Sequence, residues 1–155
     1  MKLSTRLLKW YKKEGRSLPW RNTHDPYHIL VSEMMLQQTQ VSRVINFYTA
    51  WLRQFPDWKS LANASNADVI KAWAGLGYNR RALALRDIAK QVIKNGIPKN
   101  RDEWLKLKGV GPYTSAALAI FSLKQKELPI DTNIRRTLGR LLLGIPYPQS
   151  KDDAS

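Results

Sequence analysis

The chain is 155 residues long and carries a formal charge of +14, from 26 Lys and Arg against 12 Asp and Glu. This length favours a single domain with a sizeable hydrophobic core. The positive charge is large for that length and points to a polyanionic partner, most simply nucleic acid. A basic protein without such a partner would show the same total, so charge alone leaves both readings open.

The sequence contains no cysteine, which excludes disulfides and cysteine-ligated zinc or iron–sulfur centres in these residues. It is compatible with a reducing cytoplasm. The basic first residues do not read as a signal peptide, and no stretch approaches the ~20 apolar residues of a membrane span. His24 and His28 have no third partner that would predict a metal site. We therefore expect a cytoplasmic protein without a metal ion or a membrane contact.

Helical patterns follow one another along almost the whole chain. Gly15 ends the first, Asp25 and Pro26 open the second, Pro56 stops the third, and Gly96 closes a later one. No segment alternates as a strand does, so the sequence predicts an all-α fold. The predicted helices cover residues 2–14, Pro26 through Met34, Val41 through Phe55, Ser65 through Trp73, 80–94, 101–107, 112–123 and 131–143.

The stretch LKGVGPYTSAALA at residues 107–119 joins two of these helices through a tight turn. Gly109 and Gly111 permit positive φ and a close approach of the backbone, and Pro112 suits the first position of a helix. The free amides and positive dipole end of that helix then form a site for a phosphate. This pattern predicts a helix–hairpin–helix, which holds the DNA backbone without reading sequence. An ordinary turn between two helices is the alternative.

Two carboxylates are candidates for catalysis. Glu33, in SEMMLQQTQ, has apolar neighbours that would raise its pKa, as a general acid requires. Asp131, in PIDTNIRR, opens the last predicted helix. Each carboxylate also has a structural interpretation. Asp131 would serve as a helix cap, and Glu33 would be a partly exposed helix residue or the partner of an arginine. In a basic, DNA-gripping protein, two carboxylates suggest glycosidic chemistry.

Several motifs in order resemble the helix–hairpin–helix DNA glycosylase superfamily, and most closely its MutY-type adenine DNA glycosylases. The resemblance runs from about Trp10 to about Leu143. The stretches that carry it are LPWR at 18–21, DPYHILVSEMMLQQTQV at 25–41, GLGYNRRAL at 75–83, LKGVGPYT at 107–114 and DTNIRR at 131–136.

The resemblance implies roles for particular residues. Glu33 would protonate the adenine as it leaves, Asp131 would steady the sugar cation, and Asn133 would hydrogen-bond to the carboxylates or the attacking water. The resemblance assigns contacts with the extruded base, or with the gap it leaves in the stack, to Arg16, Trp20, Arg21, Leu36, Gln37, Gln38 and Tyr78. It assigns contacts with the DNA backbone to Gly109, Val110, Gly111 and Thr114.

Tyr113 stands where lyase members of the superfamily, such as endonuclease III, have a lysine whose amine forms a Schiff base. A phenol cannot form an imine, so Tyr113 predicts a monofunctional enzyme that leaves an abasic site. Packing against the next helix is compatible with that reading. The implied function is hydrolysis of the N-glycosidic bond of adenine opposite 8-oxoguanine or guanine. The alternatives are a thymine or uracil mismatch glycosylase and a catalytically weak or inactive DNA-binding fragment.

The resemblance also implies an arrangement of parts. A six-helix barrel-like domain would cover about 22–130 with the helix–hairpin–helix at 105–119, and residues 1–15 and 131–145 would form an incomplete second lobe, followed by a polar tail at 146–155. Relatives usually continue into an iron–sulfur loop and a domain that reads 8-oxoguanine. We expect a nucleoid-associated monomer that binds double-stranded DNA with a mispaired or damaged base, takes no iron–sulfur cluster, allows a monovalent cation at the hairpin, and draws on a separately encoded C-terminal part.

Overall fold

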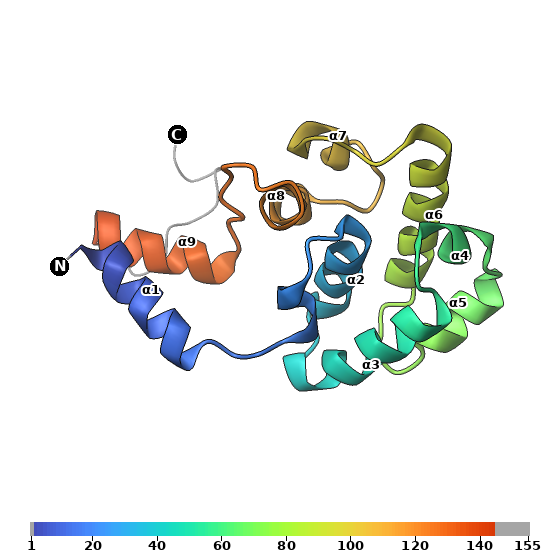
Figure 1. The fold of residues 1–155 in the computed structure, drawn as a ribbon, viewed down its shortest axis with the longest axis horizontal. Coiled ribbons are helices and arrows are strands. Elements are labelled where there is room, and N and C mark those ends of the chain that lie inside the picture. Colours follow the sequence, from blue (N-terminus) through green and yellow to red (C-terminus); the bar gives the residue numbers. More distant parts are fainter. Residues whose placement is uncertain (1, 145–155) are drawn as a thin grey trace.

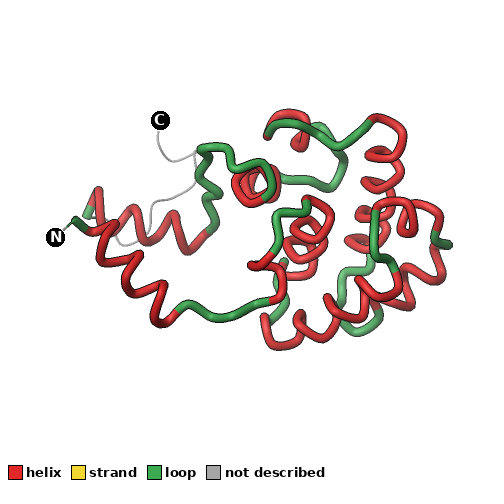
Figure 2. The backbone as a smooth tube through the Cα atoms, viewed as in Figure 1, coloured by secondary structure: helices red, strands yellow, loops and turns green. Residues whose placement is uncertain are grey.

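The computed structural model describes residues 2–144, and within that range the chain forms helices and loops but no strand (Figures 1 and 2). The predicted all-α class is confirmed. The elements in chain order are α1 (Leu3–Glu14), the 3-10 helix η1 (Pro19–Asn22), α2 (Pro26–Leu36), α3 (Val41–Gln54), α4 (Trp58–Asn63), α5 (Asn66–Trp73), α6 (Arg80–Asn95), α7 (Arg101–Leu105), α8 (Pro112–Phe121), α9 (Thr132–Leu138) and the π-helix η2 (Gly139–Leu143).

The predicted helix ends are capped as their residue types require. The Asp25 side chain accepts a hydrogen bond from the Tyr27 amide at 2.7 Å, and Pro26 occupies the first position of α2. Gly96 ends α6 with φ +86°, which is unfavourable for a residue with a side chain. These caps fix where each helix begins and ends, and therefore which residues reach the site.

Two local features were not predicted. Helix α4 was missed, because Asp57 and Ser60 form a capping box with serine in place of the usual Glu or Gln at its third position. The last predicted helix, 131–143, divides at Gly139 into α9 and the π-helix η2.

Helix α2 lies at the centre of the fold, between α3, α6 and α8 (Figure 1). A helix enclosed by neighbours needs apolar residues on all sides, and α2 supplies them. Its buried side chains are Tyr27, Ile29, Leu30, Val31, Ser32, Met34 and Met35. The one acidic residue of α2, Glu33, is therefore held in an apolar setting by a helix enclosed by its neighbours.

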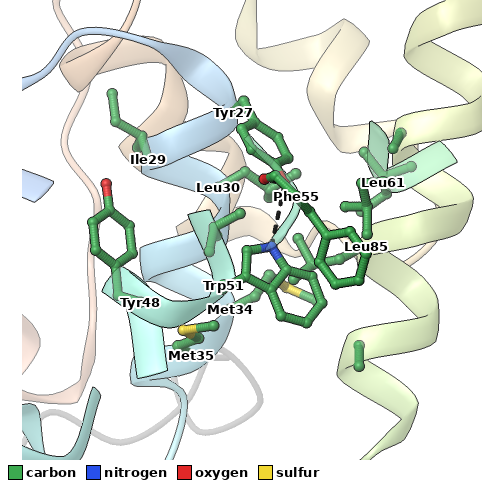
Figure 3. Packing of buried hydrophobic residues seen from close by; sticks show 14 of the residues in the cluster. Tyr27, Ile29, Leu30, Met34, Met35, Tyr48, Trp51, Phe55, Leu61 and Leu85 are labelled. Atoms are coloured by element: carbon green, nitrogen blue, oxygen red, sulfur yellow. Dashed lines mark hydrogen bonds between the residues drawn. The ribbon is translucent and has the colours of Figure 1, made fainter. Parts of the chain in front are cut away.

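Aromatic side chains join α2 to α3 (Figure 3). Trp51 donates its indole N–H to the Tyr27 hydroxyl at 3.2 Å, and that hydroxyl donates to the carbonyl of Phe55 at 2.6 Å. The Trp51 ring also meets Trp73 of α5 edge to face, with centroids 5.4 Å apart. Pairs of this kind add about 0.5–1.5 kcal/mol beyond area burial. The core thus fixes α2, and Glu33 with it, against three helices.

Helices α1 and α9 occupy the opposite end of the molecule from α4 and α5 (Figure 1). No residue of α1 is buried. Its exposed apolar residues are Leu3, Leu7, Leu8, Trp10 and Tyr11, and those of η2 are Leu141, Leu142 and Leu143. The division into a barrel and an incomplete second lobe stays a prediction, and residues 145–155, including the expected tail, lie outside the described range. No described helix is long and apolar enough to cross a membrane.

Candidate active site

Burial raises the pKa of the Glu33 carboxyl from 4.5 to about 7. Desolvation is the largest cause, because the charged form loses water. A hydrogen bond with Tyr113 opposes the shift, and the negative charge of Asp131 adds to it. The raised pKa predicted from the apolar neighbours of Glu33 is confirmed in direction. At neutral pH a large fraction of Glu33 therefore keeps its proton.

Tyr113 is the second residue of α8, directly after the hairpin. Burial raises its pKa to about 12, and the charges of Glu33 and Asp131 act in the same direction. The phenol is therefore neutral and can donate its proton in a hydrogen bond to Glu33. This contact joins α2 to α8 at the point where the hairpin ends.

Two cavities meet at Glu33. Pocket A has a volume of about 650 Å³ and lies against α2, η1 and α8. Glu33, Leu36, Val41 and Tyr113 also line pocket B, so these four side chains stand between the two spaces. Pocket A is lined by Tyr11, Arg16, Leu18, Trp20, Arg21, Thr23, His24, Ile29, Ser32, Glu33, Leu36, Val41, Tyr113, Ile120 and Phe121.

The walls of pocket A are aromatic and apolar, with two arginines at its edge. The Trp20 ring is buried against Tyr48, edge to face at 5.4 Å. Arg21 donates to the carbonyl of Arg16 at 2.7 Å, and its guanidinium lies over the Tyr11 ring at 5.4 Å. The structure therefore brings Arg16, Trp20 and Arg21 to one cavity with Glu33, as their common assignment to a base pocket requires.

Pocket B has a volume of about 840 Å³ and collects the other predicted residues outside the hairpin. It brings the segment after α2 together with the start of α6 and the start of α9. Its lining residues are Glu33, Leu36, Gln37, Gln38, Thr39, Val41, Tyr78, Arg80, Arg81, Tyr113, Asp131, Thr132 and Asn133. Glu33 and Asp131, which lie far apart in sequence, thus share one cavity.

Asp131 is held by its position as the N-cap of α9. Its Oδ1 accepts a hydrogen bond from the Ile134 amide at 2.6 Å. The capping role considered for Asp131 is therefore real, and the same bond orients the carboxylate that lines pocket B. Asn133 is exposed, and its Oδ1 accepts a hydrogen bond from Arg136 at 2.9 Å.

Gln38 and Tyr78 are exposed residues with left-handed backbones, at φ 56° and φ 50°. A non-glycine residue in this conformation costs of order 1–3 kcal/mol and persists only when its surroundings enforce it. Both side chains line pocket B. Two of the residues assigned to the extruded base, or to the gap it leaves, therefore stand on turns with left-handed backbones.

The hairpin lies between α7 and α8. Gly109 has φ +101°, whereas Gly111 has φ −88° and a β carbon placed on it would meet no atom within 4 Å. Only the first glycine thus needs positive φ, which corrects the expectation for the pair. Val110 and Thr114 are buried, so their side chains anchor the hairpin. The backbone amide of Thr114 has no acceptor within the helix, and the DNA contact of Thr114 stays a prediction.

Sequence reasoning did not single out several residues at the site, Arg81 first among them. A signal for it was present, because Arg81, Leu85, Ile88 and Val92 recur at helical spacing and all are buried. His24 was considered only as a metal ligand, and its Nδ1 lies 2.8 Å from the carbonyl of Phe121 at the edge of pocket A. No local pattern marks that contact.

The sequence model of the family described as "HhH-GPD superfamily base excision DNA repair protein" matches residues 31–152. The chain belongs to this superfamily. Two similar relatives are adenine DNA glycosylases. The one from Mycobacterium tuberculosis is 42% identical over 144 residues, which cover 90% of this chain and 47% of the relative. The human one is 40% identical over 147 residues, which cover 87% of this chain and 27% of the relative.

The chain is thus a homologue of adenine DNA glycosylases of base excision repair, and it spans about half of the mycobacterial relative and about a quarter of the human one. A solved thermostable thymine-DNA glycosylase superposes with a TM-score of 0.81 at 29% identity, over 87% of this chain and 64% of that one. Endonuclease III trapped on DNA gives a TM-score of 0.76 at 19% identity, over 88% and 65%, which establishes a common fold.

Proposed function

We propose that this chain hydrolyses the N-glycosidic bond of adenine mispaired with 8-oxoguanine or guanine in double-stranded DNA, leaving an abasic site. The observation that carries the proposal is the enclosed Glu33 carboxyl, with a pKa raised to about 7 between two cavities. Loss of adenine needs a proton on the base as the bond breaks, and a group with this pKa is suited to supply it near neutral pH. Homology to adenine DNA glycosylases supports the same target base.

The reaction would divide between the two carboxyl groups. Glu33 gives its proton to a ring nitrogen of adenine, and the base leaves with the electrons of the C1′–N bond. The sugar then carries positive charge, which the Asp131 carboxylate offsets. A water oriented by Asn133 bonds to C1′ and gives up a proton to a carboxylate. The products are adenine and an abasic site, and no external electron donor is needed.

A base inside a duplex cannot reach these groups and has to be extruded. Pocket A has the volume and the aromatic walls to hold a purine, with Trp20 and Leu36 against the ring and the two arginines at its edge. Gln38 and Tyr78 would enter the duplex to fill the space the base leaves. Their exposure and fixed backbones suit that role, because a wedge that yields cannot hold bases apart.

The hairpin would hold the DNA backbone. The amides of Tyr113 and Thr114 open α8 without intrahelical acceptors, and Gly111 leaves open space beside them. A phosphate placed there would be held by the backbone of Tyr113, the residue whose phenol contacts Glu33. This arrangement supports a contact with the DNA backbone that sets the distance to the reacting sugar. The monovalent cation at the hairpin and the monomeric state stay predictions.

Tyr113 supports a hydrolase without lyase activity. Its phenol cannot form an imine with the opened sugar, and its contact with Glu33 gives it a different task, which is to orient the acid. We therefore expect intact abasic product and strand cleavage only after treatment with heat or alkali.

Two alternatives have observations in their favour. The structural likeness to a thymine-DNA glycosylase at 29% identity favours excision of thymine or uracil from mispairs. The short span relative to the adenine DNA glycosylases favours a DNA-binding fragment with little turnover. Adenine is favoured over thymine or uracil because its release needs an acid for a purine ring nitrogen, and Glu33 is suited to be that acid.

Single-turnover excision distinguishes the adenine glycosylase from the mismatch glycosylase and from the DNA-binding fragment. Labelled duplexes carry A opposite 8-oxoguanine, A opposite G, or T opposite G, and each is tested with and without alkali. Glu33→Gln is compared with Glu14→Gln, which makes the same change on the exposed α1, outside both pockets. Cleavage at adenine alone, lost in Glu33→Gln and kept in Glu14→Gln, supports the proposal. Cleavage at T·G supports the mismatch alternative, and binding without cleavage supports the fragment.

A further inference from the structure

Arg81, the second residue of α6, is 9% exposed although it borders pocket B. Its neighbour Arg80 is exposed to solvent. A buried guanidinium is expensive unless its donors are satisfied. Nη1 and Nη2 of Arg81 have hydrogen-bond partners, whereas its buried Nε has none among the described residues. The partners of the two terminal nitrogens therefore indicate what the position serves.

Within the described residues Arg81 donates five hydrogen bonds, and all of them go to backbone carbonyls on two different segments. Nη1 donates to the end of α2 and the turn after it, at Met34 (2.7 Å), Met35 (3.4 Å) and Gln37 (2.6 Å). Nη2 donates to the loop before α6, at Leu76 (3.4 Å) and Gly77 (3.0 Å). One planar group thus ties the segment after Glu33 to the segment that carries Tyr78.

Aromatic rings enclose the same group. The guanidinium lies 5.3 Å from the Trp73 ring and 5.5 Å from the Tyr78 ring. No carboxylate of the described residues forms an ion pair with it. The charge is stabilised by ring faces and by the carbonyls at the end of α2, where the helix dipole is negative. Such a site fixes geometry in a way that an exposed ion pair does not.

Each of the two tied segments contains a non-glycine residue with positive φ, Gln38 in one and Tyr78 in the other. Strained backbones of this kind need surroundings that enforce them. Two of the five carbonyls that accept from Arg81 belong to Gln37 and Gly77, the residues that immediately precede Gln38 and Tyr78. Its bonds therefore act on the two peptide groups that set the direction of both side chains.

We propose that Arg81 is a positioning residue that locks the Gln37–Gln38 turn and the Gly77–Tyr78 turn at a fixed separation, so that both side chains act on one duplex as a unit. Arg81 is itself buried and holds the two turns by donating hydrogen bonds to their backbone carbonyls. We call this link between the two turns the brace. The brace is a property of the free protein, whereas its consequence for DNA rests on the proposed function.

The brace is tested first without DNA, by hydrogen–deuterium exchange. Arg81→Lys keeps the charge but cannot bridge both segments, since an ammonium lacks the planar fork of a guanidinium. Arg86→Lys makes the same change on the same helix, away from both pockets. In Arg81→Lys we expect exchange about tenfold faster in residues 37–40 and 75–79, or about 1.4 kcal/mol, with the rest of α3–α8 and the whole control unchanged.

A uniform rise in exchange would overturn the proposal, because Arg81 would then only stabilise the fold, and so would no change in either segment. If Arg81→Lys does not fold, Gly77→Ala replaces it. The strain of φ +77° displaces the carbonyl that accepts from Arg81. The brace then requires faster exchange in residues 37–40, which lie on a different segment, and unchanged exchange there would overturn it.

Excision gives the second readout. Arg81→Lys should lower the single-turnover rate at saturating protein about tenfold, or about 1.4 kcal/mol. Its Kd for a fully paired duplex should stay within about twofold, because the hairpin grip is intact. Equal losses in rate and in paired-duplex affinity would overturn the positioning role. If the wild-type chain excises nothing, the proposed function fails while the exchange result still decides whether Arg81 is a brace.

Discussion

Replacing Glu33 by glutamine should stabilise the protein at alkaline pH. The folded-state pKa of about 7 lies above the ordinary glutamate value of 4.5, so the folded chain holds this proton more tightly than the unfolded chain. The resulting stabilisation is fully present below about pH 4.5 and is lost as the pH rises through 7. Glutamine is neutral at every pH and avoids that loss.

The size of the effect follows from the shift. About 2.5 pH units correspond to about 3 kcal/mol of differential interaction. Because Glu33 keeps some access to solvent, screening reduces this figure, and we expect about 1–3 kcal/mol. The free energy of unfolding of Glu33→Gln, minus that of the wild type, should therefore rise by this amount between pH 4.5 and pH 8 and then level off.

The assay is urea unfolding followed by far-UV circular dichroism at closely spaced pH values. The difference between variant and wild type removes the titration that both chains share. Glu14→Gln, on the exposed α1, supplies the trend for a glutamate-to-glutamine change outside the site, and this trend is subtracted. A difference that does not vary with pH, or that falls as the pH rises, would refute the burial argument for Glu33.

The hairpin and Tyr113 give further predictions. Gly109→Ala should lower the free energy of unfolding by about 1–3 kcal/mol in urea melts, because φ is +101° and the new methyl would meet Ala84 at 3.1 Å. Gly111→Ala should change it by less than about 1 kcal/mol yet weaken duplex binding about tenfold in a filter assay. Equal duplex affinities of Gly109→Ala and Gly111→Ala would argue against a phosphate at Gly111. Tyr113→Lys should allow borohydride to trap a protein–DNA adduct that the wild type does not form; efficient trapping by the wild type would contradict the monofunctional reading.

Most helices were predictable from sequence because their limits are chemically local. Asp25, Pro26 and Gly96 act on the next few residues, and the structure places them as caps. Helix α4 was missed although its signal is equally local, since Ser60 takes the place where a capping box usually has Glu or Gln. Helix α4 therefore departs from the usual motif in its residue type, whereas its capping hydrogen bonds are ordinary.

The site depends on contacts that no local pattern contains. The apolar neighbours of Glu33 predicted the direction of its pKa shift, but its contacts with Tyr113 and Asp131 join three separate segments. The resemblance to DNA glycosylases, and not the spacing of these residues, placed them together. The helical spacing of Arg81 indicated that it would be buried, but the five carbonyls from two segments that accept its hydrogen bonds leave no mark in a sequence.

The measurement that tests the central claim most directly is the pH dependence of single-turnover adenine excision opposite 8-oxoguanine. If Glu33 is the acid, the rate at saturating protein should be constant at low pH and fall about tenfold per pH unit above about pH 7. Glu33→Gln should lose excision throughout, while Glu14→Gln follows the wild type. A rate that stays constant or rises between pH 6 and pH 9 would contradict the account.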